Sequence, residues 1–168
     1  ISLCMIVKNE EKFLPQCLQS VAESMDEIII VDTGSTDSTV EIARRYTDKI
    51  YFHPWEGDFS KHRNQSISYA TKDWIFILDA DEVVAGNSRA NIRQAIRDVS
   101  VDCIYLTVRS AFDHSKGEAV HNSPRIFRNN AIIHYEGRVH NRLVGEKCSK
   151  IYPVTILHEG YNLPPEEA

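Results

Sequence analysis

The first half of the chain alternates between two hydrophobic periods, and this alternation constrains the fold more than any other feature of the sequence. Short apolar runs that predict buried strands are separated by segments whose apolar residues recur at helical spacing. The predicted strands are residues 2–7, 27–31, 49–52 and 74–79, and the predicted helices are residues 10–23, 38–46 and 59–71. Such alternation is typical of an α/β fold with a mostly parallel central sheet flanked by helices.

The second half predicts a smaller mixed or antiparallel section. A helix is expected at about residues 88–98, and strands are expected at residues 102–108, 124–127, 131–135 and 152–157. Polar turns that contain glycine separate these strands, as in antiparallel sheets. We find no repeat or internal linker, so we expect one domain over residues 1–168.

The composition bounds the function. The chain is 42% hydrophobic and 26% charged, with a net charge of −5, which is typical of a compact soluble protein. No basic face is evident, which argues against a nucleic-acid partner, and no apolar run approaches the ~20 residues that cross a bilayer. The four cysteines lack zinc-site spacing, so we expect reduced thiols and a cytoplasmic protein, with peripheral association with a membrane left open. Because the chain begins at Ile1 rather than Met, we expect a fragment of a longer protein.

The predicted strand at residues 74–79 leads into the sequence Asp79-Ala80-Asp81. Side chains alternate along a strand, so Asp79 and Asp81 are expected on the same side. Ligands of open α/β sheets bind at the carboxyl ends of strands, and carboxylates suit Mg²⁺ or Mn²⁺, with substrate phosphates as the other ligands. The turn therefore predicts a metal–diphosphate site. The alternative is that Asp81 caps a following helix.

Polar residues also follow two other predicted strands, at residues 8–10 and 32–35. A parallel sheet would bring both segments to the same edge as Asp79. Asp32 is a candidate to accept hydrogen bonds from a base or a ribose; its alternative role is to form the turn and cap the next helix. Arg63, on the helix before the aspartates, is a candidate partner for a phosphate or for Asp79, and its alternative is a solvated charge.

Four motifs in this order and at this spacing resemble the inverting glycosyltransferases of family two, whose fold is called GT-A. They are Cys4-Met-Ile-Val-Lys-Asn-Glu-Glu11, Ile30-Val-Asp-Thr-Gly-Ser-Thr-Asp37, Phe59-x-x-x-Arg63-Asn64 and Leu78-Asp-Ala-Asp-Glu82. Segments at 124–128, 135–140 and 157–161 extend the resemblance to a subgroup that often carries C-terminal helical repeats and includes peptide S-glycosyltransferases of bacteriocins. The resemblance implies a nucleotide-binding half at about 1–85, an acceptor-side half at about 86–168, a UDP-sugar donor, Mg²⁺ or Mn²⁺, and transfer with inversion.

The resemblance implies which residues hold the uracil and ribose of the donor. These are Val7, Asn9, Glu10, Asp32 and Thr33. Many relatives have two acidic residues before the glycine of this motif, whereas the second position here is Thr33. Recognition of the base by two carboxylates is therefore not expected.

The resemblance also assigns the diphosphate and metal site. Arg63 would steady the diphosphate or Asp79, Asp79 and Ala80 would contact the ribose or donor sugar, and Asp81 would ligate the metal. His158 resembles a late histidine that completes the metal or diphosphate site, and neutral imidazole suits such metals. Its alternative is a capping or buried histidine.

The catalytic base is the least defined part of the resemblance. Inverting transfer needs a group that takes the acceptor proton. Many relatives supply a Glu-Asp pair past the metal motif, which this chain lacks, and close relatives read Val-His-Glu where this chain has Asn141. The candidates are His140, which we favour, then Glu136 and Asp113, with Asp79 as a further residue at the reacting centre. A thiol acceptor would need less help because it ionises readily.

The acceptor and the partners are left open. A peptide, a glycan or a lipid-linked glycan would fit the resemblance, and we expect residues 112–123 and whatever follows Ala168 to select it. The oligomeric state is undetermined, with a homodimer through a region after residue 168 as one option. Trp55 and Phe59 are candidates to stack on a sugar, but we expect them in the core, where large aromatic residues usually lie.

Two other functions compete with glycosyl transfer. One is a non-catalytic module that keeps the nucleotide-sugar site but has lost the base, an alternative that Asn141 leaves open. The other is a phosphatase of the haloacid-dehalogenase type, which residues 78–83 resemble, although the second acidic cluster of such enzymes is missing. The chain has neither G-x-G-x-x-G nor G-x-x-x-x-G-K-[ST], which excludes a dinucleotide-binding oxidoreductase and a P-loop kinase.

Overall fold

The computed structural model describes residues 1–111 and 117–158. The helices are α1 (Leu14–Val21), α2 (Thr39–Ala43), α3 (Phe59–Ser68) and α4 (Arg89–Ala95), with short 3₁₀ helices η1 (Ala22–Ser24) and η2 (Gly86–Ser88). The strands of the first half are β1 (Ser2–Val7), β2 (Glu27–Asp32), β3 (Ile50–Phe52), β4 (Trp74–Ile77) and β5 (Glu82–Val84). Those of the second half are β6 (Cys103–Ala111), β7 (Glu118–Arg128), β8 (His134–Glu136), β9 (Arg142–Val144) and β10 (Ser149–His158).

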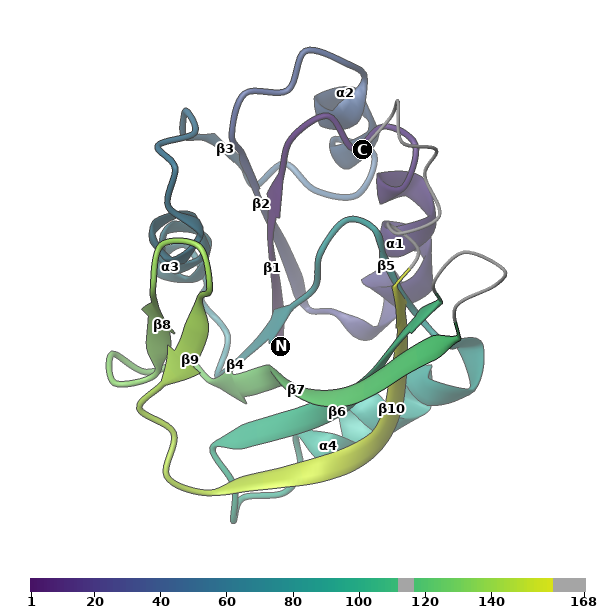
Figure 1. Ribbon diagram of the computed structural model, residues 1–168, viewed down its shortest axis with the longest axis vertical. Coiled ribbons are helices and arrows are strands. Elements are labelled where there is room, and N and C mark those ends of the chain that lie inside the picture. The colour runs from purple at the N-terminus through teal and green to yellow at the C-terminus, as the bar shows by residue number, and fades with distance from the viewer. Residues whose placement is uncertain (112–116, 159–168) are drawn as a thin grey trace.

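A large sheet runs through the molecule in the order β3-β2-β1-β4-β7-β6-β10-β5 (Figure 1). Strands β3, β2, β1 and β4 are parallel, whereas β7 is antiparallel to both of its neighbours and β5 is antiparallel to β10. Strands β8 and β9 form a separate antiparallel pair. The predicted α/β fold is confirmed, with a parallel first half and a mixed second half.

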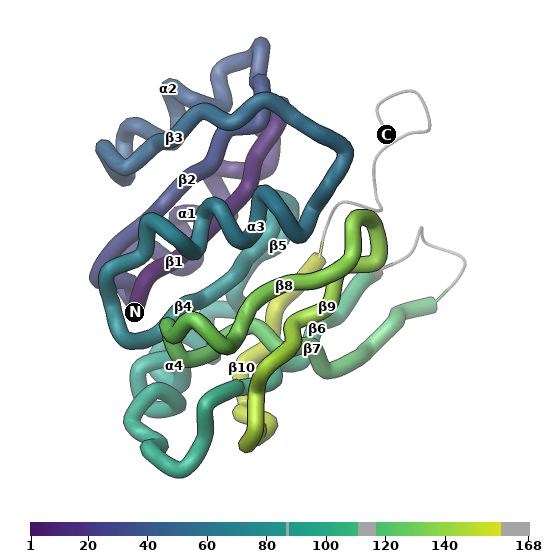
Figure 2. Tube along the Cα trace, turned by 90° about the vertical axis from the view of Figure 1, so that its left-hand side faces the viewer, coloured from purple at the N-terminus to yellow at the C-terminus, as the bar shows by residue number. Residues whose placement is uncertain are grey.

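Each face of the sheet buries its own cluster of apolar side chains because side chains alternate along the strands. Leu3 of β1 belongs to the same buried cluster as Leu14 and Leu18 of α1 and Ile92 of α4. Cys4, the next residue, faces the opposite cluster, which the β8–β9 pair and α3 cover (Figure 2). Helices α1, α2 and α4 therefore cover one face of the sheet, and helix α3 and the β8–β9 pair cover the other. No helix within the described ranges combines the length and the apolar composition needed to cross a bilayer.

Several helix boundaries differ from the prediction. Helix α1 begins at Leu14 rather than residue 10, and Pro15, which has no N–H to donate, lies in its first turn. Helix α2 ends at Ala43 rather than 46. Helix α3 begins where predicted, because the Asp58 carboxylate accepts a hydrogen bond from the Lys61 N–H at 3.0 Å and caps its first turn.

The strands of the second half differ more. Residues 118–123, which we expected in an acceptor-selecting loop, form the outer half of β7 and pair with β6. This part of β7 is mostly exposed and polar, so it lacks the alternation that marks a half-buried strand. The three-residue strands β9 and, in the first half, β5 were also missed, because three residues show no period and each of these strands, unlike β3, begins with a charged residue. Strand β10 begins at Ser149 and changes register around Pro153, which cannot donate to a ladder.

Candidate active site

The carboxyl ends of the parallel strands meet at one edge of the sheet, as predicted. Val7 at the end of β1 pairs with Asp32 at the end of β2, and β4 runs parallel to β1 on its other side. Strand β4 ends at Ile77, so Asp79 and Asp81 lie in a turn, and the alternation argument for a shared side does not apply. A strand, β5, follows Asp81, so the helix-cap alternative for this residue is wrong.

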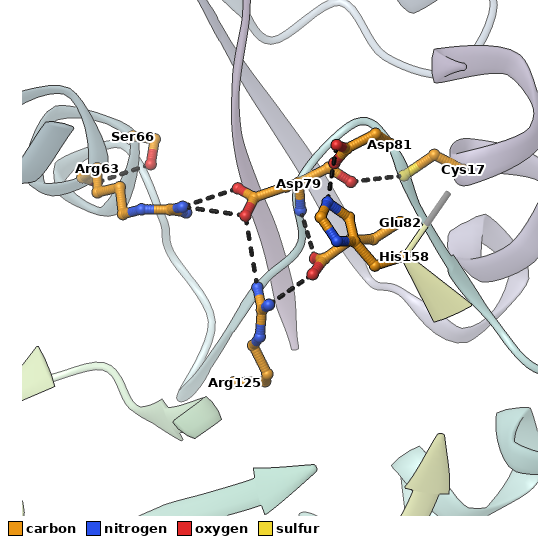
Figure 3. Close-up of polar contacts among 8 residues, drawn as sticks. All are labelled: Cys17, Arg63, Ser66, Asp79, Asp81, Glu82, Arg125 and His158. Atoms are coloured by element: carbon orange, nitrogen blue, oxygen red, sulfur yellow. Dashed lines mark hydrogen bonds and ion pairs between the residues drawn. The ribbon is translucent and has the colours of Figure 1, made fainter. Parts of the chain in front are cut away.

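Two arginines from distant elements hold the Asp79 carboxylate (Figure 3). Arg63 of α3 donates from Nη2 to both carboxylate oxygens at 2.8 and 3.1 Å. Arg125 of β7 places Nη1 3.7 Å from Oδ2 on the other side. Burial opposes ionisation of Asp79, but these two positive charges outweigh it and hold the pKa of the carboxyl below its usual value. Asp79 is therefore a fixed, ionised acceptor.

Glu82 ties the same turn to β7. Its carboxylate is almost fully buried and accepts a hydrogen bond from Arg125 Nη2 at 2.5 Å. The other oxygen accepts the backbone N–H of Asp79 at 2.9 Å. Burial raises the pKa of Glu82, although the Arg125 charge opposes this. The Asp79–Glu82 turn is thus held through its backbone and through its side chains.

Asp81 meets the end of β10. Its Oδ2 lies 2.9 Å from His158 Nε2, and His158 Nδ1 lies 3.2 Å from the hydroxyl of Ser110. Sheet pairing creates this group, because His158 lies opposite Glu82 in β5 and opposite Ser110 in β6. The hydrogen bond to Asp81 raises the pKa of His158. The two residues predicted as metal ligands therefore contact each other.

The donor atoms at this point fit a divalent cation that also binds a substrate. Among the residues that the structure describes, no three His, Cys, Asp or Glu side chains are grouped to hold a metal by themselves. Asp81 and His158 supply one carboxylate and one imidazole, and Mg²⁺ or Mn²⁺ commonly takes its remaining ligands from substrate phosphates and water. Ser110 orients the ring through its second nitrogen, as the outer partners of metal-binding histidines do.

A cavity of about 210 Å³ lies beside this site. It is lined by Ile6, Val7, Lys8, Glu10, Thr33, Trp55 and Phe59. Trp55 and Phe59 pack edge to face with ring centroids 4.8 Å apart, and they are 38% and 39% exposed. Our expectation that these rings lie in the core is wrong; they form a wall of the cavity. Burial, with the nearby Asp81, Asp37 and Asp79 charges, raises the pKa of Glu10 to about 7.

The other residues predicted to contact the nucleotide shape the loops around the cavity. The Asp32 carboxylate accepts the N–H groups of Gly34 and Ser35 at 3.0 and 3.1 Å, which is the turn-forming role given above as its alternative. Asn9, with φ of 55°, accepts the Thr36 N–H at 2.8 Å and so ties the β1–α1 loop to the β2–α2 loop. Ala80 is buried.

The candidate bases lie on the β8–β9 pair. Glu136 is exposed, and its carboxylate lies 3.3 Å from His134 Nε2. His140 is exposed in the connection between the two strands. Within the described residues, no hydrogen bond or ion pair joins Glu136 or His140 to Asp79. Asp113 and residues 159–161 of the last motif lie outside the described residues.

Sequence reasoning assigned no role to Arg125, Glu82 or Ser110. A signal existed for Arg125, because a charged residue inside a run predicted to be a buried strand needs a partner. Glu82 had the weaker signal of following the two aspartates directly. Ser110 had none, since only the pairing of β6 with β10 brings it to His158.

Comparison with known proteins agrees with this architecture. The family model described as "Glycosyl transferase family 2" matches residues 2–151. The chain belongs to this family. Membership sets aside the phosphatase alternative. The SPbeta prophage-derived glycosyltransferase SunS of Bacillus subtilis is 33% identical over 171 residues, which cover 96% of this chain and 40% of that protein. The chain thus spans less than half the length of this relative.

Two solved structures show the same GT-A fold. S. aureus TarS 1–349 in complex with UDP-GlcNAc superposes with a TM-score of 0.63 and 17% identity, over 97% of this chain and 61% of that chain. The glucosyl-3-phosphoglycerate synthase from Mycobacterium tuberculosis in complex with Mn²⁺ and UDP-glucose superposes with a TM-score of 0.54 and 17% identity, over 64% of this chain and 43% of that chain.

Proposed function

We propose that this family 2 domain transfers a sugar from a UDP-sugar to an acceptor, with Mg²⁺ or Mn²⁺ and with inversion at the anomeric carbon. The observation that carries the proposal is the pairing of Asp81 with His158 beside the Asp79–Arg63 pair, at the sheet edge where ligands of α/β folds bind. The UDP-sugar complexes of the two structural neighbours support the donor class.

The cavity between β1 and Trp55 is the proposed site for uracil and ribose. Its apolar wall, formed by Val7 and the Trp55 ring, suits the face of a planar base. The Thr33 hydroxyl donates to the Val7 carbonyl at 3.1 Å, which keeps the floor of this cavity in place. From here the diphosphate of the donor would extend toward Asp81.

Asp81 and His158 would hold the divalent ion, which supplies charge stabilisation for the departing diphosphate. Asp79, kept ionised and oriented by Arg63 and Arg125, would accept hydrogen bonds from hydroxyls of the ribose or donor sugar. We propose His140 as the group that takes the acceptor proton, with Glu136 as the alternative. Determination of the product anomer tests inversion, and a retained configuration would contradict the direct displacement.

The acceptor classes that fit are a peptide, a glycan and a lipid-linked glycan. The four cysteines are unpaired, which supports a reducing compartment such as the cytoplasm. A non-catalytic module that binds a nucleotide sugar is the alternative function. It is favoured by Asn141, which places an amide rather than a carboxylate in the cavity next to Asp79.

Calorimetric titration of UDP and GDP with Mn²⁺ or Mg²⁺ tests the donor site. We expect metal-dependent binding of UDP that is lost in Asp81→Ala and kept in Asp48→Ala, a matched variant at an exposed aspartate with no role in the site. Tight binding of GDP instead would change the donor class. Absence of binding for both nucleotides would contradict the proposal, whereas UDP binding without turnover on any acceptor class would favour the non-catalytic module.

A further inference from the structure

Asp79 lines a second cavity, of about 360 Å³, which is distinct from the proposed uracil site. It shares no lining residue with that site. Strand β7 and the β8–β9 pair form most of its wall. Because Asp79 is the proposed contact of the donor sugar, a molecule in this cavity would lie next to the sugar that is transferred.

The polar lining of this cavity is dominated by arginine. Arg63, Arg125 and Arg142 line it, together with the uncharged Asn141, and Asp79 is its one carboxylate among the described residues. The chain as a whole has 24 acidic and 19 basic residues and a net charge of −5. Three positively charged guanidinium groups therefore gather around one cavity of a chain whose net charge is negative.

Two of these three arginines are neutralised by carboxylates, and the positive charge of the third is not. Arg63 is paired with Asp79, and Arg125 is paired with Glu82, so these four groups balance. Arg142, exposed on β9, has no ion pair among the described residues. The Nε–H groups of Arg63 and Arg125 are also buried without hydrogen-bond partners, so each of these two guanidinium groups keeps one donor that no protein group satisfies.

A neutral acceptor would not need this arrangement. A guanidinium group presents parallel N–H donors that match the oxygens of a carboxylate or a phosphate. In a partly enclosed cavity such a pair is screened less than it is on an open surface. Asn141 can donate a further hydrogen bond from its amide.

We infer that this cavity binds an oxyanion carried by the acceptor, a phosphate or a carboxylate, with Arg142 as its principal contact. The acceptor is thus an anionic molecule, and Arg142 selects it. The inference rests on the proposed function, because it places the acceptor beside the donor sugar that Asp79 contacts.

The test uses glycerol 3-phosphate as the probe. Glycerol is the uncharged control, and glycerate tests whether a carboxylate binds in place of the phosphate. The protein is first saturated with UDP and Mg²⁺, so that the probe does not report on the diphosphate site. Binding is followed through the arginine Nε–H resonances in nuclear magnetic resonance spectra. Arg142→Gln is compared with Arg45→Gln, a matched change at an exposed arginine after α2.

We expect saturable binding of glycerol 3-phosphate that weakens about tenfold or more in Arg142→Gln, as loss of a charged hydrogen bond predicts. Arg45→Gln should bind glycerol 3-phosphate as the unchanged protein does. The affinity of Arg142→Lys should lie between the affinities of Arg142→Gln and Arg45→Gln. Binding of glycerate as well would assign carboxylates to the same site.

Equal affinity of the unchanged protein and Arg142→Gln for glycerol 3-phosphate would overturn the inference. Equal affinity of the unchanged protein for glycerol and glycerol 3-phosphate would do the same. Failure of UDP to bind at the first step would instead contradict the proposed function, so the two failures are distinguishable.

Discussion

Replacing Arg125 with methionine is the perturbation whose effect the structure defines best. Arg125 neutralises Glu82 in the interior, where the two side chains are 11% and 3% exposed and their nearest N and O atoms are 2.5 Å apart. Methionine keeps much of the apolar stem of arginine but removes the charge. Glu82 would then keep its hydrogen bond from the Asp79 N–H and lose its cation.

The expected loss follows from this burial. Removing one partner of a buried pair typically costs about 3–5 kcal/mol, because the remaining charge is left uncompensated. Asp79 keeps its ion pair with Arg63 in the variant, so only Glu82 is left without a cation. We therefore expect a loss of stability at the lower end of this range, about 3 kcal/mol. This would be a large part of the roughly 5–15 kcal/mol that stabilises a typical protein.

The assay is urea unfolding at pH 7, with the free energy of unfolding extrapolated to water. Arg109→Met is the matched control, since Arg109 of β6 pairs with Glu118 of β7 at 2.7 Å while both side chains are more than 40% exposed. We expect about 1 kcal/mol or less for this control. The double variant Arg125→Met/Glu82→Gln removes the stranded charge and keeps an acceptor for the Asp79 N–H, so it should be more stable than Arg125→Met alone.

The pH dependence gives an independent check of the same reasoning. Without Arg125, burial raises the pKa of Glu82 further above its unfolded value. The folded variant then holds a proton that the unfolded chain releases, so its stability falls as pH rises through the folded pKa. The difference in free energy of unfolding between Arg125→Met and the unchanged protein should therefore become smaller from pH 8 to pH 5. A loss no larger than that of Arg109→Met, or a gap that widens at low pH, would refute the buried-charge argument.

Three further outcomes are expected. Ser110→Ala should weaken metal-dependent UDP binding by about tenfold, because His158 loses the partner that orients its ring, and calorimetry should show no change for Thr107→Ala on the same strand. Trp55→Ala should weaken UDP binding by on the order of tenfold whether or not metal is present, since loss of base stacking does not involve the ion; an effect seen only with metal would contradict this. The folded pKa of Glu10, about 7, lies above its unfolded value, so its contribution to stability is present at low pH and is lost as pH rises through about 7. Glu10→Gln should therefore show a smaller fall in unfolding temperature between pH 5 and pH 8 than the unchanged protein.

The strands that are buried on both faces were predictable because each is a continuous apolar run. Residues 27–31 are buried throughout and lie in β2 as expected. The outer half of β7 was not predictable on this basis, because its exposed polar residues are held by hydrogen bonds to β6 rather than by burial. The same holds for Trp55, whose ring lies at a cavity wall that no local pattern marks.

The sequence by itself determined the strand–helix alternation and the position of Asp79 and Asp81 after a buried strand, since both follow from local periodicity. Only the tertiary structure decided what surrounds these carboxylates. Arg125 reaches Asp79 because β7 pairs with β4, and His158 reaches Asp81 because β10 lies between β5 and β6. Pairing between strands far apart in the chain depends on the packing of the whole sheet, and no local stretch of sequence encodes it.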